Sequence, residues 1–173
     1  MDDLAKLTLV TGGAASGKSR FAEGLLAGAN AKLYLATAEA HDAEMAEKIR
    51  AHQAMRGNGW HTSEAPLDLP EALSIATGDQ VVLVDCLTMW VSNLLLADRA
   101  IEPAFDALDF ALATCPARIV CVTNEVGSGI VPDNSLARRF RTAQGQLNQR
   151  IAARADLVVA VMSGLPLTLK GTL

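Results

Sequence analysis

Short apolar runs alternate along the chain with longer segments of helical periodicity. Residues 81–84 (VVLV) and 119–122 (IVCV) lack the polar alternation of a half-exposed strand, which is typical of strands buried on both faces. The alternation of such strands with helices predicts an α/β domain whose mostly parallel sheet is flanked by helices. The predicted strands are residues 7–11, 32–36, 81–85, 118–124 and 157–161, and the predicted helices are residues 18–27, 42–56, 87–96, 104–113 and 135–155.

A glycine-rich sequence directly follows the first predicted strand and opens the first predicted helix. Residues 12–19 read GGAASGKS, which fulfils the pattern G-x-x-x-x-G-K-[ST] of a phosphate-binding loop, or P-loop. Its glycines let backbone N–H groups turn toward a polyphosphate, and the helix start adds donors and a partial positive charge. Lys18 can reach the outer phosphates, and the Ser19 hydroxyl can ligate Mg²⁺. The sequence therefore predicts a P-loop NTPase-like domain whose nucleotide site includes Gly12, Gly13, Ala14, Ala15, Ser16, Gly17, Lys18 and Ser19.

Composition and charge narrow the class of protein. The 173 residues suit a single domain, predicted over residues 1–173, and half of them are apolar. The net charge of −4 argues against a nucleic-acid-binding surface, and no apolar run reaches the about 18 residues of a membrane span. The acidic N-terminus lacks a signal-peptide pattern, and three widely spaced cysteines fit reduced thiols, so we expect a cytoplasmic protein. An apolar surface covered by another subunit also fits this composition.

Asp85 ends the most apolar of the predicted strands. Ligands of parallel α/β sheets bind beyond the carboxyl ends of the strands, so Asp85 is expected near the P-loop. In P-loop proteins an acid at this place holds the Mg²⁺ shell, often through water. We therefore assign Ser19 and Asp85 to the metal, with capping of the helix that begins at Leu87 as the alternative role of Asp85.

A basic stripe with a histidine at its centre runs along the second predicted helix. Lys48, His52 and Arg56 recur every four residues, so they share one helical face. The two cations tend to lower the pKa of His52 and to keep its imidazole neutral, as a nucleophile requires. The stripe could also bind phosphates, and an ordinary solvated face is the alternative. His41, near a helix start, and His61, in a predicted loop, are weaker candidates for a catalytic histidine.

Three further polar segments are candidates for the site. Residues 124–132 (NEVGSGIVP) combine two glycines and a proline beyond a strand end, which indicates a shaped loop over the site. Glu64 is an acid near loop residues, and a solvated charge is its alternative role. Arg138, Arg139 and Arg141 begin a predicted helix whose face could bind a polar substrate, contact a subunit or face solvent.

The order of these motifs resembles the bifunctional adenosylcobinamide kinase / adenosylcobinamide-phosphate guanylyltransferases of cobalamin synthesis. The P-loop is generic, but its combination with the segment E-M-(x)6-H, which ends at His52, and with N-E-V-G-(x)-G-I-V-P is specific. The resemblance covers nearly the whole chain. It implies that ATP or GTP phosphorylates adenosylcobinamide, and that GTP then transfers GMP to this phosphate through a guanylylated His52. The alternatives are a P-loop kinase without guanylylation and a nucleotide-dependent regulatory switch.

The same resemblance implies a set of nucleotide contacts and partners. It implies Mg²⁺, GTP and ATP, adenosylcobinamide and its phosphate, and a homo-oligomer, with a trimer as the expected form. Ala15 stands where the family commonly has an arginine, and Thr142 stands where an aspartate is common. Besides the P-loop, the implied nucleotide contacts are Ala36, Thr37, Ala38, Gln53, Ala54, Met55, Arg56, Glu64 and Asp85.

Overall fold

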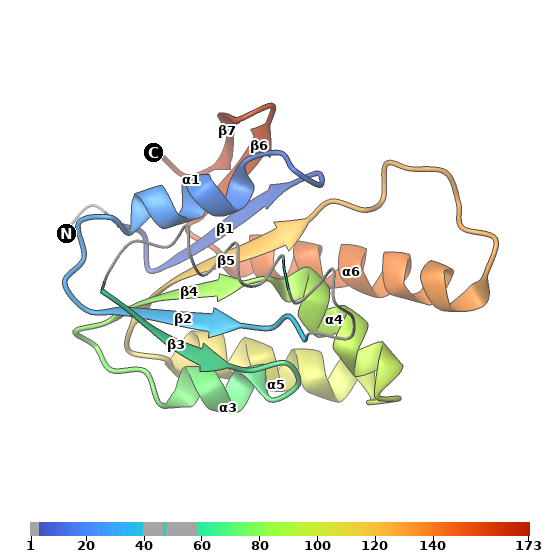
Figure 1. Cartoon of the computed structure of the whole chain (residues 1–173), viewed down its shortest axis with the longest axis horizontal. Coiled ribbons are helices and arrows are strands. Elements are labelled where there is room, and N and C mark those ends of the chain that lie inside the picture. The colour runs from blue at the N-terminus through green and yellow to red at the C-terminus, as the bar shows by residue number, and fades with distance from the viewer. Residues whose placement is uncertain (1–3, 40–46, 48–58) are drawn as a thin grey trace.

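The computed structural model describes residues 4–39, 47 and 59–173. The strands are β1 (Leu7–Gly12), β2 (Lys32–Ala36), β3 (Trp60–Glu64), β4 (Val81–Asp85), β5 (Arg118–Asn124), β6 (Leu157–Met162) and β7 (Leu165–Lys170). They form a seven-stranded sheet in the order β3-β2-β4-β5-β1-β6-β7 (Figure 1). β7 runs antiparallel to β6, and the other neighbouring pairs are parallel. The predicted mostly parallel α/β sheet is thereby confirmed.

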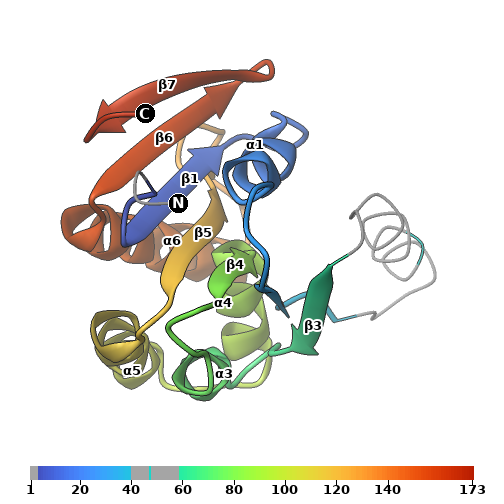
Figure 2. The same cartoon turned by 90° about the vertical axis from the view of Figure 1, so that its left-hand side faces the viewer.

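Helices cover both faces of this sheet. They are α1 (Lys18–Leu25), α3 (Leu69–Ser74), α4 (Leu87–Leu96), α5 (Ile101–Thr114) and α6 (Ser135–Arg154). α1 lies on one face, and α3, α4, α5 and α6 lie on the other (Figure 2). Each face therefore has its own apolar core, as expected for a parallel sheet.

The uninterrupted apolar run of β4 is explained by the burial of both its faces. Val82 and Val84 pack into the core beneath α3 to α6, whereas Val81 and Leu83 pack into the core beneath α1. All four side chains are at most 2% exposed. Because successive side chains of a strand point to opposite faces, a strand between two helical layers has no position that favours a polar residue.

The predicted elements agree closely with the structure wherever it describes them. β2, β4, β5 and α4 have the predicted bounds, and β1 and β6 extend one residue further. α1 ends two residues earlier than predicted, and α6 ends one residue earlier. α5 begins three residues earlier and ends one residue later than predicted. The α5 start was misplaced because Pro103 lies in its first turn, where a missing N–H breaks no helical hydrogen bond. The predicted helix over residues 42–56 falls almost wholly outside the described residues.

Two strands and a short helix were not predicted. β3 is mostly polar and half-exposed at one edge of the sheet, so it lacks the apolar signal of its neighbours. The prediction that His61 lies in a loop was wrong, because His61 lies within β3 and pairs with Leu33. β7 forms the other edge and is exposed along its whole length, and α3 is short with a proline in its first turn.

The cysteines match a further expectation. Cys86, Cys115 and Cys121 are free thiols. Burial raises the pKa of the Cys121 thiol to about 12, so this thiol stays protonated at neutral pH. None of the helices in the described part of the chain is long and apolar enough to cross a membrane.

Candidate functional site

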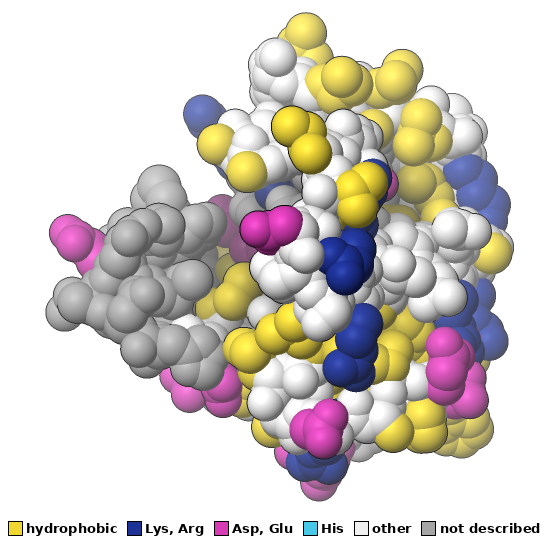
Figure 3. Space-filling view, turned by 90° about the vertical axis from the view of Figure 1, so that its right-hand side faces the viewer, with side chains coloured by type: hydrophobic (Ala, Val, Ile, Leu, Met, Phe, Trp, Pro, Cys, Tyr) yellow, Lys and Arg dark blue, Asp and Glu magenta, His cyan; other side chains and the backbone are white. Residues whose placement is uncertain are grey.

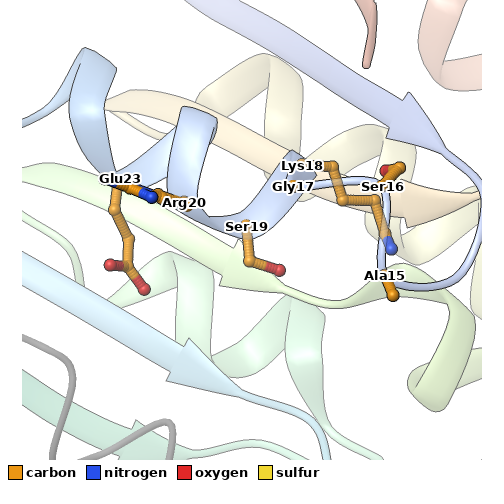
Figure 4. Close-up of a pocket in the computed structure, with 7 residues that line it drawn as sticks. All are labelled: Ala15, Ser16, Gly17, Lys18, Ser19, Arg20 and Glu23. Carbon is orange, nitrogen blue, oxygen red and sulfur yellow. The ribbon is translucent and has the colours of Figure 1, made fainter. Parts of the chain in front are cut away.

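The chain passes from β1 into α1 at the carboxyl ends of the parallel strands (Figure 1). A cavity lies along this P-loop. Its volume is about 560 Å³. The side chains that line it come from the loop and from the first turns of α1 (Figure 4). Arg20 and Glu23 were not predicted, although Arg20 directly follows the motif and Glu23 lies one helical turn beyond it on α1. The lining residues are Ala15, Ser16, Gly17, Lys18, Ser19, Arg20 and Glu23.

The loop conformation depends on Gly17 and holds Lys18 in place. Gly17 precedes α1 with a φ of 92°, a conformation that side chains with a Cβ rarely adopt. The Lys18 side chain turns back along the loop (Figure 4), and its Nζ donates a hydrogen bond to the Gly13 carbonyl at 3.1 Å. Lys18 is only 9% exposed. The ammonium group therefore already lies over the loop that would surround a polyphosphate.

The neighbouring strands hold the loop tightly on both sides. The Glu125 N–H, just after β5, donates to the Gly12 carbonyl at 3.1 Å. On the other side the Gly164 N–H, in the turn between β6 and β7, donates to the Ser16 carbonyl at 2.9 Å. A Cβ at Gly12 would lie 2.5 Å from the Val161 carbonyl oxygen, so no larger residue fits there without a backbone shift.

Asp85 lies at the carboxyl end of β4, beside the end of β2. The Tyr34 hydroxyl donates to its Oδ2 at 2.7 Å. The helix-capping alternative is not supported, because the residue before α4 is Cys86 and no side chain caps that helix. Burial, and then the Asp85 carboxylate, raise the pKa of the Cys86 thiol to about 11, so this cysteine is not a thiolate nucleophile at neutral pH.

Ser19 and Asp85 provide a hydroxyl and a carboxylate as donors. Mg²⁺ prefers oxygen ligands and is commonly bound by one or two protein groups together with substrate phosphates and water. No cluster of three or more histidine, cysteine, aspartate or glutamate side chains that could hold a metal by itself exists among the described residues. The donor set thus fits Mg²⁺ that arrives with a nucleotide.

Thr37 and Asn93 fix the end of β2. The Thr37 hydroxyl donates to the Cys86 carbonyl at 2.7 Å and accepts from the Cys86 N–H at 2.8 Å. The Asn93 side-chain amide, on α4, donates to the carbonyls of Thr37 at 2.7 Å and Pro66 at 3.0 Å. No role was predicted for Asn93, but an asparagine within the apolar helix 87–96 was a signal, because a buried amide needs partners.

Glu64 ends β3 and pairs with Ala36 at the end of β2. Thus Ala36, Thr37, Glu64 and Asp85 lie at the ends of three neighbouring strands. This place was predicted for Thr37 and Asp85, but not for Glu64, because β3 was not predicted. Ala38 directly follows Thr37. The remaining predicted residues lie outside the described part of the chain: Lys48, His52, Gln53, Ala54, Met55 and Arg56.

The loop after β5 is tied to α6 by arginines. Arg138 donates to the carbonyls of Pro132 at 2.9 Å and Asp133 at 2.6 Å, and Arg141 donates to the Gly127 carbonyl. Two of the three arginines of this predicted face therefore shape a loop. Figure 3 shows this end of the molecule, where a line of Lys and Arg side chains runs between hydrophobic, acidic and other surface groups.

Comparisons with known proteins agree with this geometry. The family model described as cobinamide kinase / cobinamide phosphate guanyltransferase matches residues 8–169. The bifunctional adenosylcobalamin biosynthesis protein CobU of Salmonella typhimurium is 43% identical, over 95% of this chain and 99% of its own. The corresponding protein CobP of Pseudomonas aeruginosa is 46% identical, over 94% of this chain and 96% of its own.

Similar solved structures show the fold alone. An ATPase from the type III secretion system of pathogenic bacteria has a TM-score of 0.57 at 10% identity, covering 95% of this chain and 57% of that one. A Pyrococcus horikoshii protein, PH0250, has a TM-score of 0.56 at 7% identity, covering 98% of this chain and 89% of its own. The chain has the P-loop NTPase fold that its sequence predicts.

We expect Lys18→Ala to weaken nucleoside triphosphate binding about 10- to 100-fold, because it removes a charged hydrogen-bond donor of ~1.5–3 kcal/mol from the loop. Titration calorimetry measures the affinity, and the melting temperature without ligand should not fall. Lys170→Ala is the matched control, since Lys170 donates to carbonyls at the end of α6. Equal affinities of Lys18→Ala and the unmodified chain would contradict the role of Lys18.

We expect Asp85→Asn to raise the Mg²⁺ concentration for half-maximal triphosphate binding at least about tenfold, because a neutral amide is a poor ligand for a hard cation. Nucleotide binding without metal should change little. Asp79→Asn serves as the control, since Asp79 lies in the turn that precedes β4, at the strand's opposite end. An unmoved Mg²⁺ titration curve would show that Asp85 does not serve the metal.

Proposed function

The chain belongs to the cobinamide kinase / cobinamide phosphate guanyltransferase family, and on this premise we propose that it phosphorylates adenosylcobinamide with ATP or GTP and then transfers GMP from GTP to the new phosphate. It is a bifunctional transferase of cobalamin biosynthesis. The observation that carries the proposal is the P-loop with its ordered Lys18, next to strand ends that present Asp85. We also propose that residues 1–173 form a single domain that performs both reactions.

We propose that the P-loop binds the phosphates of the nucleotide. Its backbone N–H groups and the Lys18 ammonium would neutralise the outer phosphates, and Ser19 and Asp85 would hold Mg²⁺. When bound, the metal shields phosphate charge and so assists transfer. Further contacts would come from the ends of β2 and β3 and from the segment after His52: Ala36, Thr37, Ala38, Glu64, Gln53, Ala54, Met55 and Arg56.

In the kinase step a hydroxyl of adenosylcobinamide attacks the terminal phosphorus of the nucleotide in line with the departing diphosphate. This reaction depends mainly on positioning and on charge stabilisation. The buried Lys18 is suited to that task because its Nζ is fixed before the nucleotide arrives. Little reorganisation of the loop is then needed at the moment of transfer.

In the second step His52 would attack the α-phosphorus of GTP and release pyrophosphate. The adenosylcobinamide phosphate would then displace the histidine and take the GMP group. Covalent catalysis of this kind divides one difficult transfer into two easier ones. The support for His52 is its match to the family motif and its place between Lys48 and Arg56 at helical spacing, where cations favour a neutral imidazole.

We further propose that the chain assembles as a homotrimer. The support is the family resemblance, together with large apolar side chains exposed on the β6–β7 hairpin: Met162 at 66%, Leu165 at 71%, Leu167 at 56% and Leu169 at 59%. Contiguous exposed apolar surface of this kind is typical of protein interfaces.

GTP labelled at the α-phosphate should leave GMP on the denatured protein when Mg²⁺ is present. His52→Ala should abolish this label and guanylyl transfer, while sparing much of the kinase reaction. The label should be released by acid and resist alkali, as expected for a phosphoramidate. His61→Ala is the matched control and should keep the label, because His61 lies within β3.

Two results would contradict the histidine mechanism. They are intact labelling in His52→Ala and label that maps to a lysine. Phosphate transfer without any retained label in the unmodified chain would instead indicate a P-loop kinase that lacks guanylylation.

Light scattering at micromolar concentration should give a mass about three times the 18.2 kDa of one chain, because the hairpin surface would be covered in the assembly. Leu167→Asp, on that hairpin, should lower the measured mass. A mass of 18.2 kDa for the unmodified chain would contradict the assembly.

A further inference from the structure

β5 lies between the strand that carries the P-loop and the strand that ends in Asp85. Its carboxyl end therefore lies between the carboxyl ends of β1 and β4 (Figure 1). The residues at this point are Asn124 and Glu125, the first two of the sequence NEVGSGIVP. The function proposed above assigns a role to neither residue.

Hydrogen bonds from β1, α4 and α6 hold the backbone at this strand end. Asn124 pairs with Gly12, and the Glu125 N–H donates to the Gly12 carbonyl at 3.1 Å. The Asn124 N–H donates to the Thr88 hydroxyl on α4 at 2.7 Å. The Asn148 side-chain amide, on α6, donates to the Asn124 carbonyl at 3.1 Å. The backbone of Glu125 is thus anchored to the first residue of the P-loop.

A buried polar network supports this anchorage. Gln144 is fully buried, and its Nε2 donates to the Thr123 hydroxyl at 2.9 Å and to Asn148 Oδ1 at 2.8 Å. The Thr123 hydroxyl donates to Asn148 Oδ1 at 2.7 Å. Polar side chains are costly to bury and apolar ones would fill the same space, so such a network is best explained by a need to fix the strand end.

The Glu125 side chain is exposed, and its carboxylate is oriented by its own loop. Its Oε1 accepts the Gly127 N–H at 2.6 Å, and Arg141 donates to the Gly127 carbonyl. Across the residues that the structure describes, Glu125 forms no ion pair. The Glu125 carboxylate thus has a fixed orientation and no cationic partner among the described residues.

We propose that Glu125 is the general base of the kinase step; this inference rests on the proposed function. The Glu125 carboxylate accepts the proton of the acceptor hydroxyl while the hydroxyl oxygen forms its bond to the terminal phosphorus. The bond between that phosphorus and the bridging oxygen breaks, and the nucleoside diphosphate leaves with the electron pair. The kinase acceptor is thereby placed on the β5 side of the P-loop.

The same base is not needed for guanylyl transfer. The acceptor of that reaction is a phosphate monoester, whose oxygen is already anionic near neutral pH and carries no proton that must be removed. Loss of the Glu125 carboxylate should therefore slow the kinase step and leave guanylyl transfer unchanged. Loss of a residue that only holds the loop or the nucleotide would slow both reactions.

The test is Glu125→Gln, which keeps the shape of the side chain and removes its basicity. The kinase kcat should fall about 10²- to 10⁴-fold, the usual contribution of a general base, with the KM for nucleotide unchanged. Guanylyl transfer to separately prepared adenosylcobinamide phosphate should be unchanged. Glu125→Asp should restore part of the kinase rate, and the acid limb of the kcat–pH profile should disappear in Glu125→Gln. Asp133→Asn, on the same loop, is the charge-matched control and should behave as the unmodified chain.

The results distinguish a failure of the Glu125 proposal from a failure of the proposed function. A kinase kcat within twofold of the unmodified chain would overturn the role of Glu125 alone. Parallel loss of both activities with weaker nucleotide binding would also overturn it, because Glu125 would then only hold the loop. Absence of both reactions from the unmodified chain would overturn the proposed function and the base together.

Discussion

The P-loop is held between the ends of its two neighbouring strands, and every other feature of the site depends on that close fit. Glu125 donates to the Gly12 carbonyl on one side, and Gly164 donates to the Ser16 carbonyl on the other. The space left for Gly12 is so small that a Cβ would lie 2.5 Å from the Val161 oxygen. The loop therefore presents its N–H groups in a fixed position, as phosphate binding requires.

The strands next to the fixed P-loop place their own polar residues beside it. Because the strands are parallel and in register, β4 places Asp85, and β2 places Thr37, at the edge where the loop turns. β5 places Glu125 between them and the loop. In the proposed function, the same edge of the sheet takes part in both transfers. The hydroxyl acceptor of the first must lose a proton, whereas the phosphate acceptor of the second is already anionic.

The sequence predicted best the strands that are buried on both faces, and the site residues that lie close together in the chain. β4 and β5 had the predicted bounds because each contributes alternate residues to two cores. β3 was missed because this edge strand is mostly polar. β7 was missed although its leucines alternate with Pro166, Thr168 and Lys170, the pattern of a strand with one apolar face. The P-loop and Asp85 could be predicted from residues close in sequence. The Tyr34 hydrogen bond to Asp85 and the Asn93 contacts join distant segments, so only the folded chain reveals them.

The most direct test of the account follows two phosphorus atoms into one product. The unmodified chain is incubated with adenosylcobinamide, Mg²⁺ and GTP labelled with one isotope at the γ-phosphate and another at the α-phosphate. If one chain performs both transfers, each adenosylcobinamide-GDP formed should contain one phosphorus from the γ-position and one from the α-position. A product with the γ-label alone would show a kinase without guanylyl transfer, and the central claim would be wrong.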